Sequence, residues 1–394
     1  MENIKWGELG FAYYKTAFNV RYHYANGQWS KMEVTDDEYI KMHMSAACLH
    51  YGLEIFEGLK AFRGVDGKVR LFRPDKNAQR MINSANRLCL PAPTVEQFVE
   101  GCVECVKRNL DFVPPYETGA SLYLRPTLLG TKTCLGVRAV DEADLIIFCA
   151  PVGPYFKGGM AAIKALIMRD QDRAAPRGTG DVKVGGNYAS SIWSLEEAHR
   201  KGFSNVLYLD AATHSKFEEF GAATFFGIKN NTYVTPKSSS ILPSITNMTL
   251  REIAKDLGLT VEERDIPVEE LATFEEAGAC GTAAVISPIG ALYDLDNNVT
   301  YDYGMKVGET CKKMYDHLQG IQYGRVEDTH NWNVLVELLF FDVKRQHLLP
   351  LTNENANRQY AIVQPIRIFF AERCIYYLLT SNISCDSGAL AAHP

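Results

Sequence analysis

The sequence lacks the features that mark several large classes of protein. Its 394 residues carry a formal net charge of −6 with both signs scattered along the chain, so no basic face is available for nucleic-acid phosphates. Ten cysteines are too few for a disulfide scaffold at this length. The densest late apolar stretch, residues 366–379, contains three charges and is shorter than the roughly 20 residues of a membrane span. Residues 1–6 show no secretory signal, so we expect a cytoplasmic protein with no nucleic-acid or membrane partner.

Several catalytic and metal-binding motifs are also missing. The nine histidines are dispersed, and neither H-E-x-x-H nor the paired Cys/His spacing of a zinc site occurs. There is no G-x-S-x-G elbow of a serine hydrolase and no Walker-type phosphate loop. Cys102 and Cys105 lie on an apolar helical stripe, so we interpret them as buried thiols rather than as a zinc or redox pair. The sequence therefore predicts no metal site.

What the sequence does have is the composition of a large globular protein. Hydrophobic residues make up 46% and charged residues 22%, and the length suggests two or three domains. In the first third, Asn26-Gly27 and Asp66-Gly67 each separate two strand patterns and predict two-residue turns with positive φ. Amphipathic helices are expected after Asp75 and after Thr94, where Gln97 completes a capping box.

A segment rich in glycine and proline, residues 151–159, marks the predicted domain boundary. Strand and helix patterns alternate after it, which indicates an α/β organisation. Further strands are expected at 122–124, 145–150, 164–168, 205–210, 225–228, 233–235 and 283–287, and further helices at 189–200 and 246–257.

The most unusual stretch surrounds Lys183. Residues 177–188 read RGTGDVKVGGNY, in which four glycines let the backbone approach a ligand and two valines flank the lysine. Desolvation by apolar neighbours lowers the pKa of a lysine and makes its amine a competent nucleophile toward a carbonyl. A solvated lysine on a glycine loop is the alternative, and the local pattern alone leaves it open.

Four further features fit a charged ligand. Residues 242–246 lead into a helix whose N-terminal N–H groups attract anions, and residues 281–283 form a second small-residue turn. Glu219, in an acidic pair before an apolar run, is suited to keeping a pyridine nitrogen protonated. Tyr123 and Arg125 share one side of a strand, where an inward arginine is costly unless it meets an anion. A helix cap, a tight turn, a solvated charged turn and a structural ion pair are the respective alternatives.

Eight segments, taken in chain order, resemble one known family. The resemblance is to the branched-chain aminotransferases, pyridoxal-phosphate (PLP) enzymes of fold type IV, and covers about residues 5–336. It implies a mixed α/β (α+β) fold with a smaller N-terminal domain over 1–150, a linker over 151–162 and a larger PLP-binding domain over 163–336, with the site at the domain interface. Residues 337–394 match nothing in the family. The eight segments are 51–64, 71–74, 121–127, 151–156, 178–188, 241–246, 281–283 and 321–325.

The family resemblance also implies roles for individual residues. Lys183 would form a Schiff base with PLP, be displaced by the substrate amine and then carry the proton between the substrate Cα and C4′ of the cofactor. The remaining cofactor contacts would come from Arg73, Ile245, Thr246 and Thr282 to the phosphate, from Tyr188 to the ring phenolate and from Glu219 to the pyridine nitrogen. Substrate contacts would come from Tyr123 with the backbone of Thr282 and Ala283 to the α-carboxylate, from Arg125 to the distal carboxylate of 2-oxoglutarate or glutamate, and from Phe56, Tyr155 and Tyr51 to an apolar side chain.

The implied reaction is reversible transamination of L-leucine, L-isoleucine and L-valine with 2-oxoglutarate. An aromatic box with one arginine at its edge can accept an apolar side chain and a carboxylate in turn. Small amino acids and 2-oxo acids are thus the expected partners, in a homodimer in which Tyr51 reaches in from the second subunit. A D-amino-acid aminotransferase, an aminodeoxychorismate lyase of the same fold type and a catalytically silent anion-binding protein are the alternatives.

Four positions depart from the family pattern. Thr224 stands where an asparagine is usual, and Ser244 and Asn247 replace a common glycine and arginine beside the phosphate segment. Ala284 stands where some animal members have the first cysteine of a redox pair, so we expect no such switch.

Overall fold

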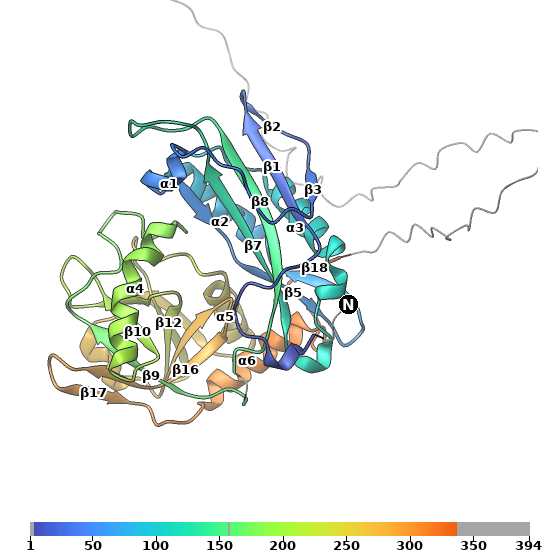
Figure 1. The fold of residues 1–394 in the computed structure, drawn as a ribbon. Helices are drawn as coiled ribbons and strands as arrows, with labels where there is room; N and C mark the ends of the chain where they lie inside the picture. Colours follow the sequence, from blue (N-terminus) through green and yellow to red (C-terminus); the bar gives the residue numbers. More distant parts are fainter. Residues whose placement is uncertain (1–3, 157, 337–394) are drawn as a thin grey trace, which may run out of the picture. The chain divides into compact units, whose positions relative to one another are not determined.

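The computed structural model describes residues 4–156 and 158–336 (Figure 1), so the predictions made for residues 337–394 lie outside the described residues. Two mixed groups of helices and strands, each built around one sheet, make up this part of the chain. The mixed α/β architecture expected from the sequence is confirmed. Among the described residues, no helix has the length and apolar character needed to cross a membrane.

The first sheet is entirely antiparallel, with strand order β18-β6-β5-β7-β8-β1-β2, while β3 pairs with β1 and β4 with β7. Helices α2 and α3 pack against one face of this sheet through their apolar stripes. The strands are β1 (Asn19–Ala25), β2 (Gln28–Trp29), β3 (Glu33–Thr35), β4 (Glu54–Phe56), β5 (Leu59–Arg63), β6 (Val69–Phe72), β7 (Ser121–Gly130), β8 (Ala143–Val152) and β18 (Asn333–Leu335), and the helices are α1 (Ala47–Tyr51), α2 (Pro74–Arg87) and α3 (Val95–Arg108).

The local signals in this region are largely confirmed. Thr94 accepts a hydrogen bond from the Gln97 amide at 3.1 Å at the start of α3, and the two thiols of Cys102 and Cys105 are buried in the core of the first sheet. Asn26-Gly27 forms the expected turn, with φ values of 53° and 80°. The prediction of a two-residue turn at Asp66-Gly67 is wrong, because β5 and β6 are joined by a longer loop. In that loop only Gly67 has positive φ, and the Asp66 carboxylate accepts from the Lys68 amide and from Arg70.

The second sheet mixes parallel and antiparallel pairs in the order β11-β10-β9-β16-β15-β12-β13-β14. Because β11 also pairs with β12, the first six of these strands form a closed ring with an apolar interior. Helices α5 and α6 pack on one another and on β15. The strands are β9 (Ile163–Met168), β10 (Asn205–Leu209), β11 (Phe217–Phe220), β12 (Thr224–Lys229), β13 (Thr232–Pro236), β14 (Thr260–Arg264), β15 (Glu276–Gly281), β16 (Val285–Asp294) and β17 (Val299–Asp302), and the helices are α4 (Gly185–Arg200), α5 (Ile245–Asp256) and α6 (Glu309–Gln322).

Differences from the sequence prediction in this region fall mainly at element ends. Helix α4 begins at Gly185, four residues before the expected start, because Val184 already provides the extended N-cap. Ala283 lies in the turn before β16 and not in the strand itself. Helix α6 was not predicted, although Cys311, Met314 and Leu318 are buried at helical spacing.

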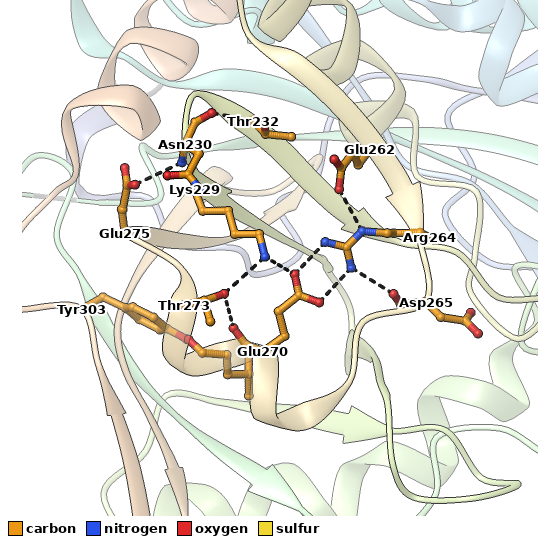
Figure 2. A network of polar contacts seen from close by, with 11 residues as sticks. Lys229, Asn230, Thr232, Glu262, Arg264, Asp265, Glu270, Thr273, Glu275 and Tyr303 are labelled. Carbon is orange, nitrogen blue, oxygen red and sulfur yellow. Dashed lines mark hydrogen bonds and ion pairs between the residues drawn. The ribbon is translucent and has the colours of Figure 1, made fainter.

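A charged network lies at the β13–β14 edge of the second sheet (Figure 2). Arg264 donates two hydrogen bonds to the Glu270 carboxylate, at 2.6 and 2.8 Å, and a third to Glu262 at 2.8 Å. Lys229 makes an ion pair with Glu270 and also contacts Thr273. These charges are therefore matched by partners within a single patch of surface.

Candidate active site

A cavity of about 390 Å³ lies where elements of both sheets meet. The first sheet and its helices contribute aromatic and cationic side chains, and the second region contributes a lysine, an acid and small-residue turns. Its main lining residues are Phe11, Phe56, Gly58, Arg80, Tyr123 and Arg125 from the first group and Arg173, Lys183, Tyr188, Glu219, Thr224, Ser244, Ile245, Thr282 and Ala283 from the second. Nine of the thirteen predicted site residues thus lie on one cavity.

Lys183 is fixed immediately before α4. Its amide donates to Ser84 Oγ at 3.0 Å, its carbonyl accepts from the Phe56 amide at 3.1 Å, and the valines on either side are buried in the core of the first sheet. The side chain extends into the cavity, with Nζ 2.6 Å from the Tyr188 hydroxyl and 4.6 Å from the centroid of the Phe56 ring. Burial, aided by the positive charge of Arg80, lowers the pKa of Lys183 to about 7. The lysine is therefore not the solvated loop residue of the alternative interpretation.

Glu219 lies on β11 and lines the same cavity. Its carboxylate pairs with Arg173 at 2.5 Å and accepts from the Leu242 amide at 3.0 Å. Burial nevertheless raises the pKa of Glu219 to about 7, because desolvation outweighs the attraction of the arginine. Arg173 was missed in the sequence, since nothing in its neighbourhood marks it as part of a site.

Tyr123 and Arg125 project from the cavity face of β7, whose alternate residues are buried on the other side. Arg125 donates to the Tyr123 hydroxyl at 3.1 Å, and its guanidinium lies 4.8 Å from the Phe56 ring centroid. Its Nε is buried without a hydrogen-bond partner, and no described carboxylate lies within ion-pair distance. The structural ion pair considered as an alternative is thus absent from the described part of the chain, which leaves a cation available to a ligand.

Two arginines of the α2 segment differ in their relation to the cavity. Arg73 donates to Thr249 Oγ1 at 2.8 Å and lies over the Trp332 ring, outside the cavity, while its Nε is buried without a hydrogen-bond partner, so its contact with a phosphate stays a prediction. Arg80, two helical turns further along α2, lines the cavity. It donates to the Pro243 carbonyl at 3.0 Å, beside the N-terminus of α5. Glu57 accepts two hydrogen bonds from Arg80, both at 2.8 Å.

The remaining predicted residues lie outside this cavity. Thr246 lines a small neighbouring cavity of about 30 Å³, which it shares with Ile245 and Thr282. Tyr51 donates to the Leu135 carbonyl and Tyr155 packs edge-on against Phe156, and both are exposed. Within one subunit, neither tyrosine walls the cavity.

Three of the departures from the family pattern are accommodated by local hydrogen bonding. Thr224 is buried and pairs with Glu219 across β11 and β12. Ser244 caps α5 by accepting from the Asn247 amide at 3.2 Å. The Asn247 side chain turns toward β13, where it accepts from the Tyr233 hydroxyl at 2.6 Å, so it does not face the cavity.

Comparison with known proteins gives a consistent result. Residues 54–292 match the family described as amino-transferase class IV. The chain is 47% identical over 344 residues to a branched-chain-amino-acid aminotransferase of Haemophilus influenzae, covering 86% of this chain and 100% of that protein. It is also 47% identical over 335 residues to the enzyme of that name from Helicobacter pylori, covering 84% and 98%. The solved branched-chain amino acid aminotransferase of Escherichia coli is 28% identical with a TM-score of 0.67, over 81% of this chain and all of that one.

Proposed function

We propose that PLP held on Lys183 is the cofactor of this chain, which belongs to the class IV aminotransferases and, within them, to the branched-chain-amino-acid aminotransferases. The reaction of these enzymes is transamination of branched-chain amino acids. The observation that carries the proposal is the placement of Lys183 Nζ inside the cavity with a pKa near neutrality. An amine that is uncharged near pH 7 can react with a carbonyl, whereas an ordinary lysine is protonated.

The cavity residues fit PLP at three points. Lys183 and Tyr188 lie within hydrogen-bond distance of one another and suit the aldehyde and phenolate side of the ring. Glu219, which lines the same cavity, suits the pyridine nitrogen. The first amides of α5, with Ile245 and Thr282, suit the phosphate, and Arg73, whose Nε is buried without a hydrogen-bond partner, stays the proposed cationic contact. Thr246 would contact the phosphate through its amide.

When bound, PLP supplies an aldehyde that joins amines and a pyridinium ring that takes up an electron pair from the substrate. Lys183 Nζ would accept the proton from the substrate Cα and return it, since a pKa of about 7 suits both directions. Glu219 would hold a proton on the ring nitrogen by hydrogen bonding and opposite charge. The Tyr188 hydroxyl accepts a hydrogen bond from Lys183 Nζ and would keep this amine oriented within the cavity.

The two substrates share one pocket. The Tyr123 hydroxyl and the backbone of Thr282 and Ala283 bind the α-carboxylate in both half-reactions. Phe56 offers an apolar surface to leucine, isoleucine or valine, while Arg125 meets the distal carboxylate of 2-oxoglutarate. The buried Arg125 Nε without a partner supports this role, because a desolvated donor gains most from an incoming anion.

A homodimer would complete this pocket. Tyr51 is exposed and lies outside the cavity of its own subunit, so we propose that it walls the cavity of a partner, with Tyr155 closing the same side. Met44, Leu135 and Val137 near Tyr51 are more than 80% exposed, and such apolar surface supports an interface there. The cytoplasmic location stays a prediction, since some plant relatives are named chloroplastic or mitochondrial.

Borohydride reduction followed by peptide mapping tests the proposal. The PLP-loaded protein is reduced, digested and analysed by mass spectrometry, and the pyridoxyl group is expected on Lys183. Lys60, the other lysine among the described residues whose pKa is lowered by burial, serves as the internal control. An adduct on Lys60 or on any other lysine would overturn the assignment. Turnover of L-leucine with 2-oxoglutarate, and not of D-alanine, separates this function from that of the D-amino-acid enzymes.

A further inference from the structure

The turn between β15 and β16 has an unusual backbone. Thr282 and Ala283 in this turn line the cavity, and Val285, two residues after Ala283 at the start of β16, has φ of +66°. A β-branched residue in the left-handed region is costly and persists only where surrounding contacts hold it. The conformation of this turn must therefore be maintained by specific interactions.

Two tethers hold the turn, and both come from the segment that contains β5. Lys60 Nζ donates to the Ala283 carbonyl at 2.8 Å, and Thr282 Oγ1 donates to the Gly58 carbonyl at 3.4 Å. The Lys60 tether is the shorter of the two and joins residues of different sheets. Since each peptide unit is planar, holding the Ala283 carbonyl fixes the plane that it shares with the Ala284 amide and thereby restricts the turn on both sides of Ala283.

Lys60 carries a positive charge that the described protein does not neutralise. It lines the small cavity of about 30 Å³ together with Thr282 and Gln322, and no described carboxylate lies within ion-pair distance of its Nζ. Burial lowers the pKa of Lys60 to about 8, which leaves it mostly protonated at neutral pH. An unneutralised cation directly behind the turn favours an anion on the turn's cavity side.

We propose that Lys60 is a positioning residue for the substrate α-carboxylate. It acts through the turn, by holding the Ala283 carbonyl so that the backbone donors of Thr282 and Ala283 keep one orientation toward the cavity. The inference rests on the proposed function, which places the α-carboxylate at this turn. It adds a residue that does not touch the substrate and that no part of the proposed reaction employs.

The test compares ligands with and without a carboxylate. Lys60→Met keeps the length of the side chain and removes its donor. Isothermal titration of the PLP-loaded protein with 4-methylvalerate, and with its uncharged amide, reports on the carboxylate directly. For the variant we expect binding of 4-methylvalerate to weaken by about tenfold or more, the scale of a lost charge-assisted hydrogen bond. Binding of the amide should change less than about twofold.

Controls separate this role from simple packing. Lys229→Met removes a different partly buried lysine, far from the cavity in the network of Figure 2, and should leave both affinities unchanged. Equal weakening of the acid and the amide, or no weakening of either, would overturn the Lys60 assignment. Should Lys60→Met fail to fold, Lys60→Gln undergoes the same comparison. A wild-type protein that neither binds 4-methylvalerate nor converts leucine would instead overturn the proposed function.

Discussion

Two glutamates in this chain have similar partners, but their pKa values are shifted in opposite directions. Glu219 lies in the cavity near Arg173 and Lys183, and Glu270 lies at the β13–β14 edge beside Arg264 and Lys229. Figure 2 shows Glu270 with its two partners. Hydrogen bonds from Arg264, with help from Lys229, lower the pKa of Glu270 to about 2. Burial raises the pKa of Glu219 to about 7 despite Arg173.

The difference shows that solvation, not the number of nearby cations, decides the outcome. At the edge of the sheet, water still supports the carboxylate, so the ion pairs add to an already favourable charge. In the cavity, the loss of water costs more than a single arginine returns. The protein thus keeps stable charges at its periphery and groups that titrate near neutrality where chemistry is expected.

The largest expected effect comes from replacing, one at a time, the lysines that lie near these two glutamates. Lys183→Ala should lower leucine turnover on the order of 10⁴-fold or more, because it removes both the attachment point and the proton carrier. Lys229→Ala should change turnover by less than about twofold, since its amine contacts Glu270 and Thr273, neither of which lines the cavity. Steady-state rates with L-leucine and 2-oxoglutarate measure both. Comparable losses in the two variants would contradict the distinction between the regions.

The two glutamates can be tested in the same way. Glu219→Gln should lower kcat about 10²-fold, because a neutral amide no longer favours a protonated ring nitrogen. Glu270→Gln should leave kcat within about twofold of the wild type. Full activity of Glu219→Gln would show that the buried acid is only structural.

Arginines extend the comparison to specificity. Arg125 has a buried Nε without a partner, whereas Arg264 donates to both oxygens of Glu270. Arg125→Gln should raise KM for 2-oxoglutarate by about 30-fold or more and KM for leucine by only a few fold. Arg264→Gln should affect neither KM. Equal increases for both substrates would indicate that Arg125 shapes the cavity and does not recognise the distal carboxylate.

Cofactor-free protein should reveal the energetic cost of the site. Because the folded-state pKa of Lys183, about 7, lies below the unfolded value of 10.5, the folded form binds the proton more weakly. Burial of the protonated Lys183 amine therefore lowers the free energy of unfolding by its full amount below pH 7, and this loss disappears as pH rises toward 10.5. Lys183→Met should therefore stabilise the cofactor-free protein on the order of 2 kcal/mol at pH 6, with a gain that shrinks above pH 7. Urea unfolding at pH 6 and pH 9 measures this, and a gain independent of pH would contradict it.

Glu270 should show the opposite pH dependence with a smaller magnitude. Its folded-state pKa is depressed from 4.5 to about 2, so its stabilisation is complete above pH 4.5 and is lost as pH falls through about 2. Solvent screening at this partly exposed position limits the contribution to on the order of 1 kcal/mol. Glu270→Gln should accordingly lose about that much in urea unfolding at pH 7 and progressively less from pH 4.5 toward pH 2.

Signals confined to neighbouring residues were predictable from the sequence. The cap at Thr94 and the paired positive φ values at Asn26-Gly27 both follow from local backbone chemistry. The same holds for Lys183, whose flanking valines already imply desolvation. These features form before any long-range contact decides them.

Residues whose role depends on long-range packing were missed. Arg80 was not predicted as a site residue, and only the way α2 packs on the first sheet directs it to the cavity. Arg173 lies 46 residues before its partner Glu219 in the sequence, and Lys60 lies 223 residues before its partner Ala283. No periodicity of a single segment encodes such pairs.

Strand β18 has a consequence for how the cavity can open. It pairs with β6 of the first sheet after the chain has completed the second, so the polypeptide crosses between the two groups twice, at residues 153–162 and again at 323–332. A single covalent link permits swivelling in any direction, whereas two separated links leave mainly a bending motion about the line that joins them. One protease cut in the earlier crossing would still leave both halves tied together through the later one.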